Sequence, residues 1–180
     1  MQFLKNIGSI FHRLVLCALL SAIFWGWVFS LAMDVKPEKK VTLYADCPAI
    51  DDIALAEKLE EDLPEGIKAM EVHSFDYAMF SQDIVSSDLY ILPASMLGDY
   101  PDAFTGSEMT LDAEALTLED GAVVYKIYDG QTRSGILTDY ITYWNDDTPP
   151  EDYYLAYGLN SVHLSDGAAQ FIAEQLLQLP

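Results

Sequence analysis

The first pattern in the chain is an apolar run near its start. Residues 14–33 contain no charged side chain. At about 1.5 Å of rise per residue, a helix of this length matches the roughly 30 Å hydrocarbon core of a membrane. Trp25 and Trp27 lie in its second half, and aromatic side chains favour membrane interfaces. The run therefore predicts a single transmembrane anchor that binds membrane lipid.

The segments on either side of the run set the expected topology. Basic residues lie on both sides, so the charge bias alone does not orient the anchor. A short basic start before one apolar segment is typical of exported proteins, so we expect residues 1–13 to be a cytoplasmic arm and the rest to be extracytoplasmic. Residues 34–40 would form a short charged linker. A cleaved signal peptide is the alternative, with Ser30-Leu31-Ala32 as the cleavage site.

Beyond the linker, the spacing of apolar residues changes from element to element. Residues 41–45 alternate as a strand does, and residues 50–63 carry the apolar stripe of an amphipathic helix. Residues 67–74 predict a second strand, 76–84 a short helix or turn, and 88–92 a third strand. The strand–helix–strand order indicates a parallel pair joined by a right-handed crossover.

Apolar runs in the second half predict three more strands and a closing helix. These are residues 122–128, 135–143, 153–157 and 166–178. Two Asp-Gly turn signals flank the first of them, which favours an antiparallel hairpin or meander. Asp166 or Ser165 is the expected N-cap of the helix. We therefore expect one three-layer α/β domain with a mixed sheet over residues 41–180.

The net negative charge of this domain limits the classes of partner that it can bind. Residues 41–180 hold four basic and 27 acidic residues, a net charge of −23. Such a surface repels nucleic acid and anionic lipid, and it favours cations and basic partners or acts only as a solvated coat. Cys47 is the single cysteine of the domain, so no internal disulfide is possible. A cysteine-poor extracytoplasmic domain favours a bacterial cell surface.

Catalytic and metal-binding patterns are weak in this sequence. The sequence has no G-x-S-x-G elbow, so neither His73 nor His163 has a recognisable serine nucleophile to activate. Cys47 is followed by Pro48, and no predicted helix begins there to lower the pKa of the thiol. There is no glycine-rich phosphate loop and no EF-hand spacing, although residues 146–152 offer a weak calcium site. We expect a protein that is not an enzyme and that has no cofactor or metal.

Four stretches together resemble a known family. They are KVTLYAD, EVHSFDY, SSDLYILPASML and EDGAVVYKIYD, within residues 41–128. They are similar to the first lobe of bacterial extracellular solute-binding proteins of the type 2 periplasmic-binding fold. The resemblance implies an α/β lobe in which the strand Asp88–Leu92 leads into a loop at the ligand cleft. Those proteins have two lobes, whereas the residues after the linker leave room for one.

The expected binding site lies where the parallel strands end. Carboxyl ends of strands are where ligands dock in open α/β sheets. The candidate ligand-binding residues are Asp46, Cys47, Ser74, Asp76, Ser95 and Trp144. Trp144 would form an aromatic platform with neighbouring tyrosines, unless those rings only pack the sheet. Ser95 could equally be no more than a helix N-cap.

These observations favour a membrane-anchored extracytoplasmic binding module for a small solute or peptide. The alternative is an accessory or scaffold subunit of a membrane transporter or cell-envelope complex. The short linker supports that alternative, because it keeps the domain close to its membrane and to any membrane protein partner.

Overall fold

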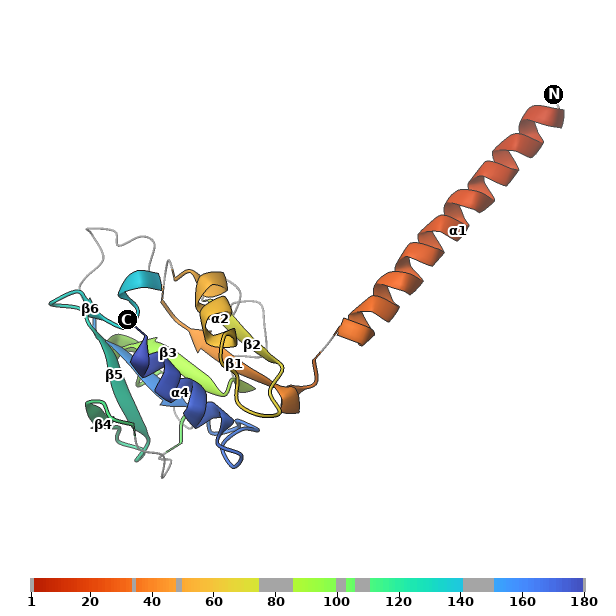
Figure 1. Ribbon diagram of the computed structural model, residues 1–180. Helices are drawn as coiled ribbons and strands as arrows, with labels where there is room; N and C mark the ends of the chain where they lie inside the picture. Colours follow the sequence, from red (N-terminus) through yellow and green to blue (C-terminus); the bar gives the residue numbers. More distant parts are fainter. Residues whose placement is uncertain are drawn as a thin grey trace. The chain divides into compact units, whose positions relative to one another are not determined.

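The computed structural model describes most of the chain as two compact units (Figure 1). The described residues are 2–33, 35–47, 50–74, 86–99, 103–105, 111–140 and 151–179, with side chains in the first range described only for residues 12–28. The units comprise Met1–Val35 and Lys36–Pro180.

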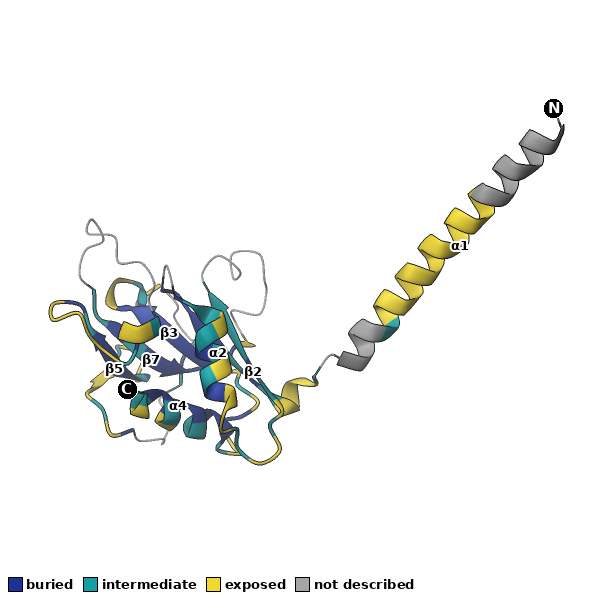
Figure 2. Cartoon of the chain, turned by 45° about the horizontal axis from the view of Figure 1, so that its top comes forward, coloured by how far each residue is buried: buried dark blue, intermediate teal, exposed yellow. Residues whose placement is uncertain are grey.

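The first unit is one long helix, α1 (Gln2–Met33). It includes the whole charge-free run, so the helical conformation expected for residues 14–33 is confirmed. The side chains of Ile23, Phe24 and Trp27 are exposed (Figure 2). Over the described ranges, no helix combines the length and apolar character needed to cross a membrane. The membrane anchor stays a prediction.

The second unit begins inside the segment expected to be a linker. A single 3-10 turn, η1 (Pro37–Lys39), leads directly into strand β1 (Lys40–Ala45). The Lys68 amide donates to the Lys39 carbonyl at 2.7 Å, which ties this turn to the sheet. The folded domain therefore starts before residue 41.

The domain is built on one mixed sheet in the order β2-β1-β3-β7-β5-β4, with β6 paired to β5. After β1 the strands are β2 (Ala69–Ser74), β3 (Leu89–Pro93), β4 (Ala115–Thr117), β5 (Val123–Asp129), β6 (Ser134–Gly135) and β7 (Tyr153–Tyr157). Strands β2, β1 and β3 run parallel, which confirms the expected parallel pair. The remaining pairs are antiparallel, and β7 lies between β3 and β5.

Alternating side chains of the central strands build an apolar cluster on each face of the sheet. Leu43 packs on one face with helices α2 (Asp52–Glu60) and α4 (Ala168–Gln178). On the other face Tyr44 meets Tyr90 edge-on, with ring centroids 6.0 Å apart. Because α2 and α4 share one face, the expected three-layer arrangement is not seen among the described residues.

The two α-helices described in the domain both start at a carboxylate. In α2, Asp51 caps the helix by accepting from the Ala54 amide at 2.9 Å. In α4 the predicted cap was wrong, because Gly167 occupies the N-cap position with a φ of 79°. Asp166 still accepts from the Ala168 amide at 2.9 Å. Glycine adopts this left-handed conformation without a steric cost, which lets the preceding side chain reach the helix start.

Two expectations in the second half of the domain need correction. Strand β4 lies between the predicted strands 88–92 and 122–128, where no strand was predicted. The strand expected over residues 135–143 is wrong as far as residue 140, because β6 ends at Gly135 and a 3-10 turn, η4 (Thr138–Tyr140), follows. The Thr138 hydroxyl donates to the Gly135 carbonyl at 2.6 Å, so a local bond replaces the strand ladder. Residues 141–143 and the helix expected at 76–84 lie outside the described residues.

Gly158 permits the close approach of the end of β7 to the start of β3. Its amide donates to the Asp88 carbonyl at 2.9 Å. A Cβ atom at this position would collide with the Ser87 carbonyl and lie 3.0 Å from the Tyr90 ring. This contact therefore excludes any larger residue unless the backbone shifts.

We predict that Gly158→Ala lowers the free energy of unfolding by about 1–3 kcal/mol, the usual cost of overpacking. Gly98→Ala is the matched control, because no described atom beyond its chain neighbours lies within 4 Å of the added methyl group. Chemical denaturation of both variants in detergent measures the difference. Equal destabilisation of the two would contradict this account.

Candidate functional site

The buried carboxylate of Asp88 organises one edge of the sheet. Asp88 precedes β3 and is 2% exposed. Its Oδ2 accepts hydrogen bonds from the Thr42 amide at 2.8 Å and the Thr42 hydroxyl at 2.9 Å. Its Oδ1 accepts from the Ser161 hydroxyl at 2.5 Å. One side chain therefore joins β1, β3 and the segment that follows β7.

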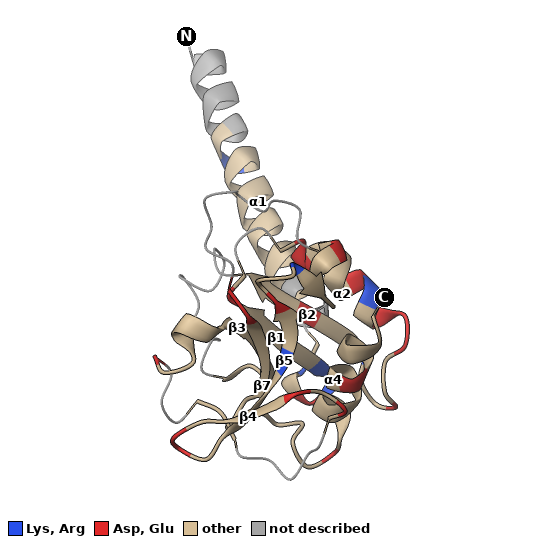
Figure 3. Ribbon diagram, turned by 90° about the vertical axis from the view of Figure 1, so that its left-hand side faces the viewer, with Lys and Arg blue, Asp and Glu red and all other residues tan. Residues whose placement is uncertain are grey.

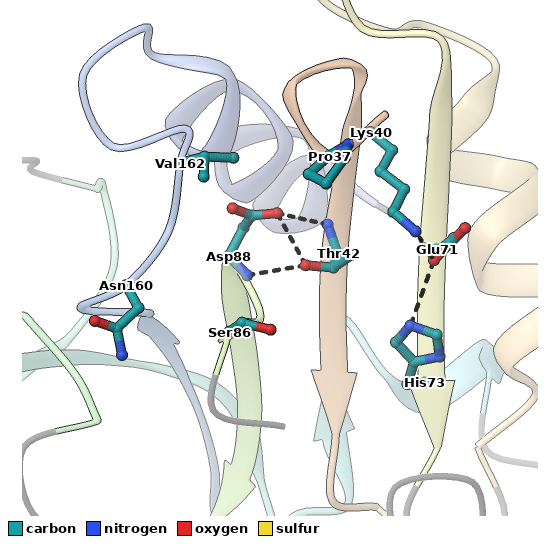
Figure 4. A pocket seen from close by; sticks show the side chains of 9 residues that line it. All are labelled: Pro37, Lys40, Thr42, Glu71, His73, Ser86, Asp88, Asn160 and Val162. Carbon is teal, nitrogen blue, oxygen red and sulfur yellow. Dashed lines mark hydrogen bonds and ion pairs between the residues drawn. The ribbon is translucent and has the colours of Figure 1, made fainter. Parts of the chain in front are cut away.

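A pocket of about 250 Å³ opens beside this carboxylate (Figure 4). We call it the amino-edge pocket, because β1 and β3 both begin there. It is lined by Pro37, Lys40, Thr42, Glu71, His73, Ser86, Asp88, Asn160 and Val162. Most of these side chains are polar, and they come from four separate segments of the chain.

A short chain of ionisable groups forms one wall of the amino-edge pocket. Lys40 Nζ lies 2.8 Å from Glu71 Oε2, and His73 Nε2 lies 3.5 Å from the same oxygen. Lys40 comes from β1 and the other two from β2, where alternation places Glu71 and His73 on the same face (Figure 4). The wall thus presents an amine and an imidazole on either side of one carboxylate.

His163 anchors the start of the domain beneath the pocket. Its side chain is 1% exposed. Nδ1 lies 2.7 Å from the Asp166 carboxylate, and Nε2 lies 3.1 Å from the Pro37 carbonyl and 3.0 Å from the Lys40 carbonyl. All three partner atoms are acceptors, so the arrangement is satisfied best when both ring nitrogens carry a proton.

The pKa values of the two partners move in the directions that this geometry requires. Burial lowers the pKa of His163, but the hydrogen bonds to Asp166 and the Pro37 carbonyl, with the charges of Asp88 and Asp166, outweigh it and leave the pKa raised. Burial raises the pKa of Asp166, but its bonds to the Ala168 amide and His163 leave the value lowered. Both shifts favour the charged pair.

Three of the predicted ligand-binding residues gather at the opposite, carboxyl edge of the parallel strands. Asp46 and Cys47 follow β1, and both are buried. Ser95, exposed in η3 (Ala94–Met96), donates to Glu151 at 3.1 Å. Burial and the charge of Glu151 raise the pKa of Asp46, which indicates that these two carboxylates are near each other. Among the described residues, Asp46 Oδ2 is buried without a hydrogen-bond partner.

Cys47 is poorly placed for nucleophilic chemistry. Burial raises the pKa of its thiol to about 11, a hydrogen bond with Tyr153 lowers it, and the charge of Asp46 raises it again. The thiol therefore stays protonated at neutral pH, and the thiolate is the form that attacks.

Ser74 lies at the same carboxyl edge, and the remaining predicted residues lie outside the described part of the chain. Ser74 ends β2 opposite Ala45 of β1 and is half-buried. Asp76 and Trp144 lie outside the described residues, as does most of the weak calcium site expected at 146–152. Over the described part of the chain, no group of three or more His, Cys, Asp or Glu side chains is placed to hold a metal ion.

Comparison with known proteins identifies no relative of this chain. No family model, no curated protein and no solved structure matches the chain. The resemblance to solute-binding proteins stays a prediction.

The sequence did not predict that the residues of the amino-edge pocket form a site. It identified Asp88 only as the start of a strand and His163 only as a weak catalytic candidate. The available signal was an acidic residue directly before a fully apolar strand, since a carboxylate buried there must find donors elsewhere.

We predict that the His163 pair makes the stability of the domain depend on pH. The pKa of His163 is higher in the folded state, so its contribution is full below pH about 6.5, the pKa of an unperturbed histidine, and is lost as the pH rises through the folded-state pKa. His163→Gln should lower the free energy of unfolding by about 1–3 kcal/mol at pH 6, the cost of an unsatisfied buried group.

Denaturation of the wild-type protein and the variant between pH 5.5 and 9 checks this. The difference between them should shrink as the pH rises. A difference that stays constant over this range would show that folding does not shift the pKa of His163, and would contradict this account.

Proposed function

We propose that the protein is a membrane-anchored extracytoplasmic binding module that holds a small zwitterionic solute, such as an amino acid, in the amino-edge pocket. The observation that carries this proposal is the combination of a preformed 250 Å³ pocket with oppositely charged groups at fixed positions. Small-molecule sites are typically concave and largely preformed, with a few polar groups that fix the ligand's orientation.

The charges of the pocket favour a ligand with both signs. Lys40 and Glu71 pair with each other, whereas Asp88 accepts its hydrogen bonds from the neutral groups of Thr42 and Ser161, and the charge of His163 also acts on it. An ionised carboxylate accepts about four hydrogen bonds, and these residues supply three. A ligand ammonium group is therefore favoured near Asp88, and a ligand carboxylate near Lys40.

The anchor is supported by the charge-free run of residues 14–33 and by its helical conformation in α1. The two carbonyls that His163 engages belong to residues just after that helix. In sequence, only residues 34–36 separate α1 from Pro37, the first residue that lines the pocket.

The proposed site differs from the one that the family resemblance implies. Ligands of open α/β sheets dock at the carboxyl ends of the strands, whereas the amino-edge pocket lies where β1 and β3 begin. The proposal thus rests on the pocket and not on the resemblance. An accessory subunit of a membrane complex is the second candidate, and the outer edge of β2, which no described strand covers, favours it.

We predict that amino acids raise the thermal unfolding temperature of the full-length protein in detergent. A ligand that binds only the folded state adds about 2.7 kcal/mol at a hundredfold excess over its dissociation constant. Sugars, short peptides and calcium, tested in parallel, should give smaller shifts. The absence of a shift with every compound would contradict solute binding, and a shift with sugars or calcium alone would contradict the zwitterion.

Lys40→Gln should lower by about tenfold the affinity for the amino acid that raises the unfolding temperature, because one charged contact contributes about 1.4 kcal/mol or more. Lys68→Gln removes a nearby exposed lysine that does not line the pocket and should leave binding unchanged. Equal affinity of the two variants would place the ligand elsewhere.

A further inference from the structure

Among the described residues, no strand pairs with the outer edge of β2. Strand β2 is at the end of the sheet order, and its inner side pairs with β1 along its whole length. The Met70 amide donates to the Glu60 side chain at 3.0 Å, so this amide points away from β1. Because the direction of backbone groups alternates along a strand, those of Val72 and Ser74 point the same way.

A groove runs between this edge and helix α2. Its volume is about 330 Å³, and it is lined by Asp52, Ile53, Ala56, Glu57, Glu60, Met70, Glu71, Val72 and His73. Ile53 lies in the groove with a side chain that is 69% exposed, although it is a large aliphatic residue. The groove therefore combines an apolar floor with strand hydrogen-bonding groups that no described strand pairs.

The rim of the groove is acidic. Asp52, Glu57 and Glu60 of α2 and Glu71 of β2 line the groove. Figure 3 shows acidic positions in red on α2. The one lysine of α2, Lys58, does not line the groove and is paired with Glu61. The side chains around the groove thus favour a positively charged occupant.

We propose that this groove binds an extended basic segment of a partner protein, which adds to the sheet as a strand beside β2. Strand addition of this kind takes its affinity from main-chain hydrogen bonds and its specificity from alternate side chains. Here the partner's main chain would pair with Val72 and Ser74, its apolar side chains would contact Ile53, and its basic side chains would meet the acidic rim.

Glu60 shows what such a strand would supply. Its carboxylate accepts from the Met70 amide at 3.0 Å, as the carbonyl of a neighbouring strand would. A second copy of this chain is a poor occupant, because residues 41–180 carry a net charge of −23 and its own β2 bears Glu71. The charge of the groove thus selects a different, basic chain.

The test uses the full-length protein in detergent and labelled peptides at about 150 mM salt, where the Debye length is about 8 Å. The probe is Lys-Val-Lys-Thr-Lys-Val-Lys-Thr, followed by fluorescence anisotropy. One control peptide replaces every Lys with Glu. A second keeps the sequence and charge but carries N-methyl groups on alternate amides, so that it cannot pair as a strand.

We expect the basic peptide to bind at least about tenfold more tightly than either control, a difference of about 1.4 kcal/mol. Val72→Pro should reduce its affinity by a similar factor, because it removes an outward-facing amide while leaving the ladder to β1 in place. Val72→Ala keeps that amide and should change affinity by less than about threefold, since it removes only part of one apolar contact.

Equal binding of the N-methylated and parent peptides would show that charge alone attracts them, and would overturn the proposal. So would unchanged affinity in a folded Val72→Pro variant, with folding checked by its unfolding midpoint. If that variant does not fold, the N-methylated peptide with the wild-type protein decides the question. Val72 does not line the amino-edge pocket, so this outcome is independent of solute binding.

Discussion

The amino edge of the domain depends on one buried charge. A carboxylate removed from water is stable only where donors replace its hydration. Asp88 obtains three such donors from two residues that are 46 and 73 positions away in sequence. The order of the edge follows from this requirement, because a shift of β1 or of the segment after β7 would leave the charge unsatisfied. Gly158 completes the arrangement by allowing the close backbone contact with Ser87.

A second polar network lies against the first and extends the ordered region to the start of the domain. His163 binds carbonyls of Pro37 and Lys40, and the charge of Asp88 helps to raise its pKa. The same short segment, from Pro37 to Thr42, therefore contacts both networks. Its backbone is fixed by His163 and its side chains by Asp88 and Glu71, which accounts for a preformed pocket at this place.

Local patterns predicted the parts of the fold that local physics determines. The alternation over residues 41–45 and the amphipathic stripe over 50–63 correspond to β1 and α2. The insertion of β7 between β3 and β5 was not predictable, since pairing of remote strands leaves no local trace. The same limit applies to the site. Strand ends pointed to Asp46, Cys47 and Ser95, but the donors of Asp88 and the acceptors of His163 are defined only by the folded chain.

The most direct test of this account is amide hydrogen exchange of the full-length protein with Asp88→Asn, compared with Asp99→Asn at an exposed position. Asparagine cannot accept from all three donors, because one of its side-chain positions is itself a donor. We expect exchange at the Thr42 amide and across residues 159–163 to rise by about tenfold or more, equivalent to about 1.4 kcal/mol, while the carboxyl edge around Ile91 is unchanged. Exchange in Asp88→Asn that matches the Asp99→Asn control would contradict the central role of the buried carboxylate.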